Sequence, residues 1–488
     1  MAVCKLERLN IVMAKQNKNC QVPTPAKYVE QMLNYVGYEQ DLWGKKVLEN
    51  SCGEGNILIE IVKRYVQDAL RNGYTAENVV RGLERDIVAY EIDPIKIDIC
   101  IGNLNILLTQ YDLPKVHWNI KNKDFLKSKE ENIDFIVGNP PYITYHDLQE
   151  EERDYLKKHF TVCKKGRIDY CYAFMEASCR SLARGGRMIY LIPFSIFRNK
   201  FADGLRAFLR DYVVKIFDYS NIDVFPGITC STAMIVCENQ NVPDQVEYKN
   251  VRSEITHRLE RFHLDKDGKK WIFEKNEEGN RRFGDYYCIH NSIATLYNKA
   301  FLFSEDTEED DYYIVSNQKI EKQITMPAVS TKSNRAMQKG KPEQRIIFPY
   351  KRINGKVAHY TEAEFKKQFP QAQKYLWQFK EGLSNRKADK KAKWFEYGRS
   401  QALSQNFSEK LILPMVLTSS TKTFIAGADT IPYAGYFITV NPDKKLPLSE
   451  AKKVLESKFF FRYVEEVGTP TTISSYRISV HDISEYRF

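Results

Sequence analysis

Long hydrophobic runs are what this chain of 488 residues most clearly lacks. Its longest apolar stretch, around residues 188–197, is interrupted by Pro193 and falls short of the ~20 residues that span a bilayer. Residues 1–17 carry four charged side chains, so they lack the uninterrupted apolar core of a secretory signal. We therefore expect a protein without a membrane anchor that stays in the cytoplasm.

Cysteine is also scarce. The chain has 10 cysteines and no Cys-x-x-Cys pair, which argues against a disulfide scaffold and against a structural zinc site. Most of them, such as Cys171 and Cys179, are expected to be small buried hydrophobic residues. We expect no metal ion. The 43% hydrophobic and 28% charged residues are typical of a folded protein, and the length predicts two or three domains.

Positive charge is concentrated in the second half of the chain. Residues 1–240 contain 32 basic and 31 acidic side chains, whereas residues 331–410 contain 19 basic and 7 acidic ones. Aromatic residues are interleaved with this basic belt, namely Phe348, Tyr350, Tyr360, Phe365, Tyr375, Trp377, Trp394 and Tyr397. A polyanionic partner explains both features, while a solvated face explains the charge alone.

Helical and extended patterns alternate up to about residue 245 and lose their rhythm afterwards. Strands are predicted at 46–49, 87–92, 133–137 and 187–192, and helices at 25–36, 57–70, 95–108 and 169–183. Thr24 is expected to be the N-cap of the first helix. This alternation predicts a doubly wound, mostly parallel sheet. We place one domain at 1–245 and a second at 246–488.

Polar residues follow the predicted strands at the edge where such sheets bind ligands. After the first strand, Glu49 precedes a Gly-x-Gly turn at Gly53 and Gly55, where the backbone can approach a ligand closely. Glu91 ends the second strand and suits the two hydroxyls of a ribose. Its distance from the glycines in sequence predicts a longer first helix. At a third strand end, Asp124 can accept from an adenine amino group and Phe125 can cover the ring.

The most informative segment is the buried strand that runs into Asn-Pro-Pro-Tyr at 139–142. Proline fixes φ and has no N–H, so this loop is built to accept hydrogen bonds. The Asn139 side-chain oxygen and the Pro140 carbonyl can bind both N–H groups of an exocyclic amine, and Tyr142 can stack on the base. A proline-rich turn without function is the alternative.

The order of these motifs resembles that of the amino-methylating DNA methyltransferases in which a target-recognition domain follows the catalytic one. Departures are Asn50, where the family usually has Pro, and Asn56 after the second glycine. Further similar stretches are Pro23-Thr24-Pro25, Asp169-Tyr170 with Phe174, Gly185-Gly186 up to Pro193, 225–232, 289–303 and 394–399.

The resemblance implies a Rossmann-like methyltransferase sheet with a mixed α+β recognition domain. It implies methyl transfer from S-adenosylmethionine to the 6-amino group of an adenine flipped out of double-stranded DNA, protecting host DNA from a cognate restriction endonuclease. It also implies that Phe225 supplies a second aromatic ring against the base. The implied cofactor-binding residues are Thr24, Glu49, Gly53, Gly55, Glu91, Asp124 and Phe125, and the implied catalytic residues are Asn139, Pro140 and Tyr142.

Two alternative functions stay open on the sequence. Cytosine, RNA or a protein amide can also offer an amine, although Ser more often occupies the first position of the tetrapeptide in cytosine enzymes. A non-catalytic DNA-binding specificity protein explains the charge but not three strand ends suited to a nucleoside. Only about 20 residues precede Pro23, so we expect the modification partner without its nuclease, acting as a monomer.

Overall fold

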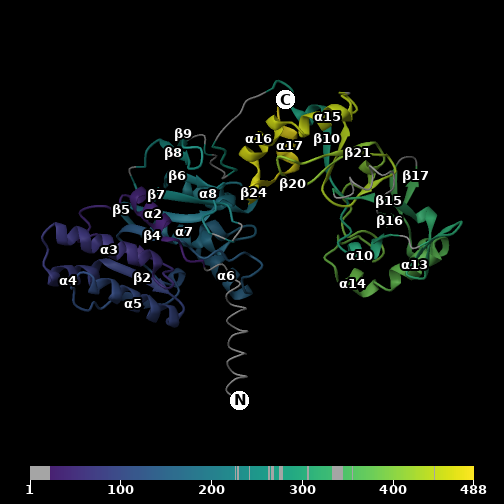
Figure 1. The fold of residues 1–488 in the computed structure, drawn as a ribbon. Coiled ribbons are helices and arrows are strands. Elements are labelled where there is room, and N and C mark those ends of the chain that lie inside the picture. Colours follow the sequence, from purple (N-terminus) through teal and green to yellow (C-terminus); the bar gives the residue numbers. More distant parts are fainter. Residues whose placement is uncertain are drawn as a thin grey trace, which may run out of the picture. The chain divides into compact units, whose positions relative to one another are not determined.

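The computed structural model describes residues 22–225, 227, 230–240, 242–261, 264, 269–273, 279–304, 307–331, 344–353, 356–444 and 446–488. The chain divides into two compact units (Figure 1). The first comprises residues 1–274 with 469–474, and the second comprises 275–468 with 475–488. Each unit is considered separately.

The first unit is built on one sheet of nine strands in the order β3-β2-β1-β4-β5-β7-β6-β8-β9. The first five in this order run parallel, and β7 is antiparallel to β5 and β6. This confirms the doubly wound α/β class. The strands are β1 (Val47–Glu49), β2 (Ile87–Glu91), β3 (Asn119–Asn122), β4 (Ile133–Gly138), β5 (Leu182–Pro193), β6 (Val213–Tyr219), β7 (Thr232–Glu238), β8 (Gln245–Asn250) and β9 (Ile255–Glu260).

Helices cover both faces of this sheet because successive strand residues point to opposite sides. In β4, Ile136 packs into the core under α7 and α8, while Val137 packs into the core under α2, α3, α4 and α5. The helices are α2 (Ala26–Val36), α3 (Asn56–Arg71), α4 (Ala76–Asp86), α5 (Pro94–Thr109), α6 (Glu150–His159), α7 (Tyr170–Ser181) and α8 (Asp203–Leu209). Cys171 and Cys179 are buried in this core, as expected.

Three details differ from the sequence expectations. A second helix, α4, fills the long interval between β1 and β2, because Gly73 at φ +79° ends α3 and the Thr75 side chain caps α4 by accepting from Asn78 N–H. Thr24 does not cap α2, whose N-cap is Pro25. The expected domain boundary near residue 245 falls before β8, whereas the sheet continues through β9.

The second unit is mixed α+β, as expected. It contains a sheet in the order β10-β23-β19-β21 and another in the order β11-β16-β15-β22. These strands are β10 (Tyr287–Asn291), β23 (Tyr436–Val440), β19 (Lys410–Leu413), β21 (Phe424–Ala426), β11 (Leu302–Phe303), β16 (Gln344–Ile347), β15 (Thr325–Val329) and β22 (Ile431–Pro432). Shorter strand pairings join β12 (Thr307–Glu308), β13 (Tyr312–Val315) and β14 (Gln318–Glu321), β17 (Tyr350–Ile353) with β18 (Lys356–His359), and β20 (Val416–Leu417) with β25 (Ser475–Arg477).

Short helices surround these strands. They are α9 (Phe283–Tyr286), α10 (Asn298–Phe301), α12 (Glu362–Gln368), α13 (Pro370–Trp377), α14 (Lys380–Asn385), α15 (Leu448–Leu455), α16 (Lys458–Val467) and α17 (Val480–Glu485). Across the described residues of both units, no helix has the length and hydropathy needed to cross a membrane.

The aromatic residues of the basic belt are mostly core residues, which corrects their interpretation as part of a binding surface. Trp377 is 48% exposed and Trp394 is half-buried. The other six are buried in one hydrophobic cluster of the second unit, namely Phe348, Tyr350, Tyr360, Phe365, Tyr375 and Tyr397. Their spacing in the sequence reflects packing, so they no longer support a polyanionic partner. The basic charge is the only one of the two features that still does.

Asp86 is expected to be a main determinant of stability in the first unit. Its buried carboxylate accepts from Gly44 N–H at 2.8 Å, from the Tyr65 hydroxyl at 2.6 Å and from Arg85. Asp86→Ala leaves these donors unpaired and should lower the free energy of unfolding by about 3 kcal/mol. Urea denaturation measures this loss. Glu77→Ala, at an exposed site of the same helix, should cost less than about 1 kcal/mol, and equal losses would contradict the assignment.

Candidate functional site

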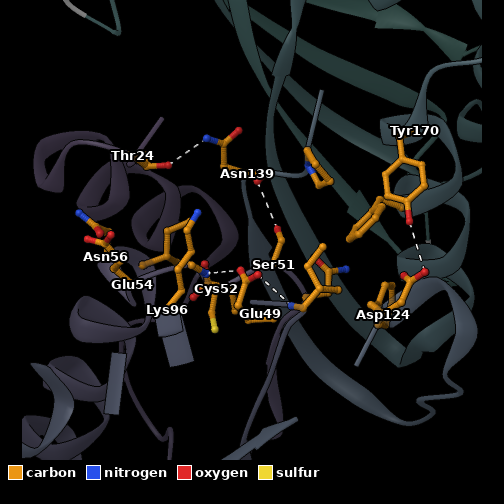
Figure 2. A pocket seen from close by; sticks show the side chains of 18 of the residues that line it. Thr24, Glu49, Ser51, Cys52, Glu54, Asn56, Lys96, Asp124, Asn139 and Tyr170 are labelled. Atoms are coloured by element: carbon orange, nitrogen blue, oxygen red, sulfur yellow. Dashed lines mark hydrogen bonds between the residues drawn. The ribbon is translucent and has the colours of Figure 1, made fainter. Parts of the chain in front are cut away.

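A cavity of about 230 Å³ opens at the carboxyl ends of β1, β2 and β4 (Figure 2). Most of the expected site residues line it, namely Thr24, Glu49, Gly53, Glu91, Asp124, Phe125 and Asn139. Four others are not among its lining residues, namely Gly55, Pro140, Tyr142 and Phe225. Residues from strands that are far apart in sequence therefore converge on one edge of the sheet, as expected for a doubly wound fold.

The glycine turn shapes the floor of the cavity. Gly55 has φ +90°, and a Cβ there would lie 2.7 Å from Cys100 Sγ, so only glycine fits. Gly55 is also the N-cap of α3, whose first residues Asn56 and Ile57 line the cavity. The N-terminal end of α3 thus faces the cavity. The Leu58 N–H there donates to the Glu49 carboxyl, and the positive end of the helix dipole favours a negatively charged ligand group.

Glu91 lies beside this turn but is already engaged. Its Oε1 accepts from the N–H groups of Ile92 at 2.8 Å and Asp93 at 2.9 Å, and its Oε2 accepts from Gly53 N–H at 2.9 Å. A carboxylate has about four lone-pair sites, so one acceptor site remains. In this conformation Glu91 can therefore accept a hydrogen bond from one ribose hydroxyl, not from both as expected.

Glu49 is the most unusual group in the cavity. It is 2% exposed, and its Oε2 has no hydrogen-bond partner among the described residues. Burial raises the pKa of Glu49 well above its usual range, and Cys52 and Glu91 raise it further. The Leu58 backbone N–H donates to this carboxyl and lowers the pKa in part, so Oε2 alone is unpaired. A buried carboxylate oxygen without a partner is costly unless a donor or a cation compensates it.

Asp124 and Phe125 lie at the far side of the cavity. The Asp124 Oδ1 accepts from Leu126 N–H at 3.0 Å, and its Oδ2 accepts from the Tyr170 hydroxyl at 3.3 Å (Figure 2). Phe125 is buried and contacts the Phe174 ring with centroids 5.7 Å apart. Asp124 is thus a cap of a short 3-10 helix and also lines the cavity, and its role toward an adenine amine stays a prediction.

Asn139 is held in one orientation by its neighbours. Its Nδ2 donates to the Thr24 Oγ1 at 3.3 Å and to the Val22 carbonyl at 3.4 Å (Figure 2). The Tyr142 hydroxyl lies 2.6 Å from the Asn139 Oδ1 and 2.6 Å from the Leu191 carbonyl. With its Nδ2 directed to the N-terminal segment, Asn139 is left with its amide oxygen as an acceptor, which receives the Tyr142 hydroxyl.

A buried network beneath this loop was not anticipated from the sequence. Asn50 donates through Nδ2 to the Ser178 Oγ at 2.8 Å and to the Tyr190 hydroxyl at 2.5 Å. A Cβ on Gly138 would lie 2.9 Å from the Tyr190 ring, so this network packs directly under the residue that precedes Asn139. The one sequence feature that pointed to this network is Asn50 itself, which occupies the position where the similar methyltransferases usually have proline.

Phe225 and Pro140 are both buried, and neither side chain lines the cavity. Phe225 is 4% exposed and belongs to the core beneath α2 and α3, so this conformation does not support stacking on a base. Pro140 is buried, while the neighbouring Pro141 lines the cavity. Part of the motif at 225–232 lies outside the described residues, namely Pro226, Ile228 and Thr229.

These residues fit S-adenosylmethionine. The unpaired Oε2 of Glu49 suits the ammonium group of its methionine part, and the remaining lone pair of Glu91 suits a ribose hydroxyl. Asp124 suits the adenine amine, and the N-terminal end of α3 suits the carboxylate. Two further lining residues, Lys96 and Tyr170, were not singled out from the sequence as cofactor-binding residues.

Glu49→Gln should affect stability and cofactor binding in opposite directions. Because burial raises the pKa of Glu49, the cofactor-free wild type should lose stability as pH rises above about 4.3, the usual pKa of Glu. Because glutamine carries no ionisable proton, Glu49→Gln should lose less folding stability over the same rise in pH. At pH 8 the variant should therefore have the larger free energy of unfolding in urea. Its affinity for S-adenosylmethionine by calorimetry should fall at least about tenfold, because a charge-assisted hydrogen bond is lost.

The exposed Glu39 provides the control, since Glu39→Gln should change neither quantity. A Glu49→Gln variant that binds the cofactor as tightly as the wild type would contradict the role assigned to this carboxyl.

Comparisons with known proteins agree with this geometry. Residues 40–225 match the model of the Eco57I restriction-modification methylase family. The type II restriction enzyme and methyltransferase RM.Eco57I of Escherichia coli is 25% identical over 67% of this chain, which spans 37% of that protein. The type II methyltransferase M.BstVI of Geobacillus stearothermophilus is 25% identical over 75% of this chain and 72% of its own length.

Among solved structures, the type IIL restriction-modification enzyme MmeI, determined in complex with DNA, matches 95% of this chain and 66% of its own chain with a TM-score of 0.59 and 13% identity. This likeness concerns the fold and includes both units. The family match covers strands β1 to β6, which include the strands whose carboxyl ends form the cavity. Residues 40–225 are therefore similar to the Eco57I restriction-modification methylases, and this likeness implies S-adenosylmethionine as the methyl donor.

Proposed function

We propose that this protein is a site-specific DNA methyltransferase that modifies the 6-amino group of adenine. The observation that carries the proposal is the orientation of Asn139 at the cavity, with both amide hydrogens directed to Val22 and Thr24 and its oxygen left as an acceptor. An exocyclic amine offers two N–H donors, which match the Asn139 oxygen and the Pro140 carbonyl.

Accepting these two hydrogens directs the nitrogen lone pair away from the loop. The bound cofactor supplies an activated methyl group on a sulfonium, so the protein mainly has to align the amine with it. Strand β4 and the network of Asn50, Ser178 and Tyr190 keep the loop rigid, which preserves this alignment.

Tyr142 has two roles in this account. Without substrate, its single hydroxyl hydrogen serves either the Asn139 oxygen or the Leu191 carbonyl, each 2.6 Å away. When the amine takes the Asn139 oxygen, the hydroxyl can donate to Leu191 without moving its ring. The half-buried ring is then placed to stack on the extruded base and to offset part of the few kcal/mol that extrusion costs.

Duplex DNA is the substrate that the comparisons favour. The relatives are restriction-modification proteins, and MmeI, whose fold is similar over both units, was solved with DNA. In the second unit, several belt lysines are exposed and have no carboxylate within ion-pair distance among the described residues, namely Lys366, Lys367, Lys374, Lys387, Lys390 and Lys391. We assign target recognition to this unit and host-DNA protection to the whole protein.

Asn139→Ala should abolish methyl transfer while leaving DNA binding nearly unchanged, because it removes an acceptor needed at the reacting amine. The test incubates the protein with labelled S-adenosylmethionine and unmethylated DNA, then identifies the modified nucleoside by mass spectrometry. The wild type should yield N6-methyladenine. N4-methylcytosine would overturn the base assignment, and no label in DNA would favour a non-catalytic binding protein.

Tyr142→Phe is the matched variant, since it removes the other partner of the same hydrogen bond but keeps the ring. This variant should transfer methyl groups within about tenfold of the wild-type rate, because the Tyr142 hydroxyl does not contact the amine in this account. Once the amine binds the Asn139 oxygen, the hydroxyl donates only to the Leu191 carbonyl, and the variant loses that one hydrogen bond. Near-wild-type turnover by Asn139→Ala would contradict the proposed acceptor.

The exposed lysines of the basic belt should set the salt dependence of DNA binding. Changing Lys387, Lys390 and Lys391 to Gln should weaken binding and flatten the slope of log K against log salt by about 0.9 for each phosphate that is no longer neutralised. The control changes three paired lysines to Gln, namely Lys319, Lys322 and Lys351, whose partners are Glu309, Glu308 and Glu364. These substitutions should change the slope less. An unchanged slope for the first set would place the belt away from DNA.

A further inference from the structure

We propose that the catalytic unit carries its own DNA-backbone contact, a basic lip formed by Lys164, Lys165, Arg167 and Lys200. It would hold phosphates next to the extruded base, separately from the second unit. The inference rests on the proposed function, because it assigns the partner of the same site.

The lip comes from two segments that lie against each other. Lys164, Lys165 and Arg167 lie between a 3-10 turn (Thr161–Cys163) and α7, and Lys200 begins a 3-10 turn after β5. A Cβ on Gly166 would lie 3.1 Å from the Phe201 ring, and the Arg167 guanidinium lies 5.5 Å from the centre of that ring.

These segments lie at the same edge of the sheet as Asn139. Strands β4 and β5 are parallel neighbours, with Gly138 opposite Tyr190, so the chain after β5 leaves at the edge where the catalytic loop leaves β4. The Tyr170 N–H donates to the Ile143 carbonyl at 3.0 Å, which joins the end of the first lip segment to the residue after Tyr142. Tyr170 itself faces the cavity (Figure 2).

The part of the lip that carries Lys200 is firmly supported. Arg206 is fully buried and donates to the carbonyls of Ile196 at 2.6 Å and Asn199 at 2.7 Å, beneath the segment that carries Lys200. The Asn199 side chain caps the turn by accepting from Phe201 N–H at 3.0 Å. A binding surface on such a scaffold loses little conformational entropy when a ligand binds.

The charge of the lip is uncompensated. Residues 160–168 and 194–202 contain no acidic side chain, although residues 1–240 as a whole are nearly neutral. All four lip residues are exposed, and among the described residues no carboxylate lies within ion-pair distance of them. Elsewhere in this unit, cations are commonly paired, as Arg187 is with Glu238. A cluster of unpaired cations beside a cavity that takes a nucleobase fits the phosphates that flank that base.

The test compares two triple variants of the full chain. K164Q/K165Q/R167Q removes two lysines and one arginine from the lip. K45Q/K115Q/R184Q removes the same charges from exposed positions at the amino ends of β1, β3 and β5, on the opposite edge of the sheet. Affinity for a duplex of about 30 base pairs is measured over a range of salt concentrations, and urea denaturation checks folding.

The lip variant should flatten the slope of log K against log salt by about 1 to 3, at about 0.9 for each phosphate that the lip neutralises, and the control should keep the wild-type slope. Equal slopes for the wild type and the lip variant, or equal losses in both variants, would overturn the lip. A loss seen with single-stranded RNA but not with duplex DNA would overturn the choice of partner.

Methyl transfer by the wild type, measured in parallel, separates the two proposals. If the wild type transfers no methyl group but the lip variant still loses its slope, the lip stands as a DNA contact and the proposed reaction fails. If the wild type methylates DNA and the slope is unchanged, the lip fails alone.

Discussion

The orientation of one amide group underlies the functional account. Because Asn139 gives both of its hydrogens to Val22 and Thr24, its oxygen is the group available to the reacting amine. The opposite orientation would present a donor and repel the amine hydrogens. In the proposed reaction, the segment before α2 has a positioning role, because it fixes which end of the Asn139 side chain faces the substrate, although it lies more than a hundred residues away in sequence.

The same sheet edge concentrates the unfavourable features of the molecule. Glu49 is buried with an unpaired oxygen, and Gly55 needs a backbone conformation that other residues rarely adopt. The unpaired Glu49 oxygen costs stability in the cofactor-free protein, and a ligand that supplies the missing donor explains it, whereas Gly55 is required by the close approach of Cys100. The stability of the domain is supplied elsewhere, by the two helical layers that pack on the sheet.

Much of the first unit could be predicted from its sequence, because apolar periodicity and capping residues are local signals. The sequence predicts the strands that end at Glu49, Glu91 and Gly138 to within a residue, and residues at or just after these ends line one cavity. Other features depend on packing between distant segments. The engagement of Glu91 by three backbone N–H groups and the burial of Phe225 have no local signature. Likewise, the belt aromatics looked like a binding surface until the core of the second unit was visible.

The central claim is that the loop after β4 grips an extruded adenine by its amine. A crystal structure of the protein with a non-reactive analogue of S-adenosylmethionine and duplex DNA tests it most directly. The account predicts the amine of a flipped adenine within hydrogen-bond distance of the Asn139 oxygen and the Pro140 carbonyl, with the Tyr142 ring stacked on the base. A base held elsewhere, or an Asn139 side chain still closed by Tyr142, would contradict it.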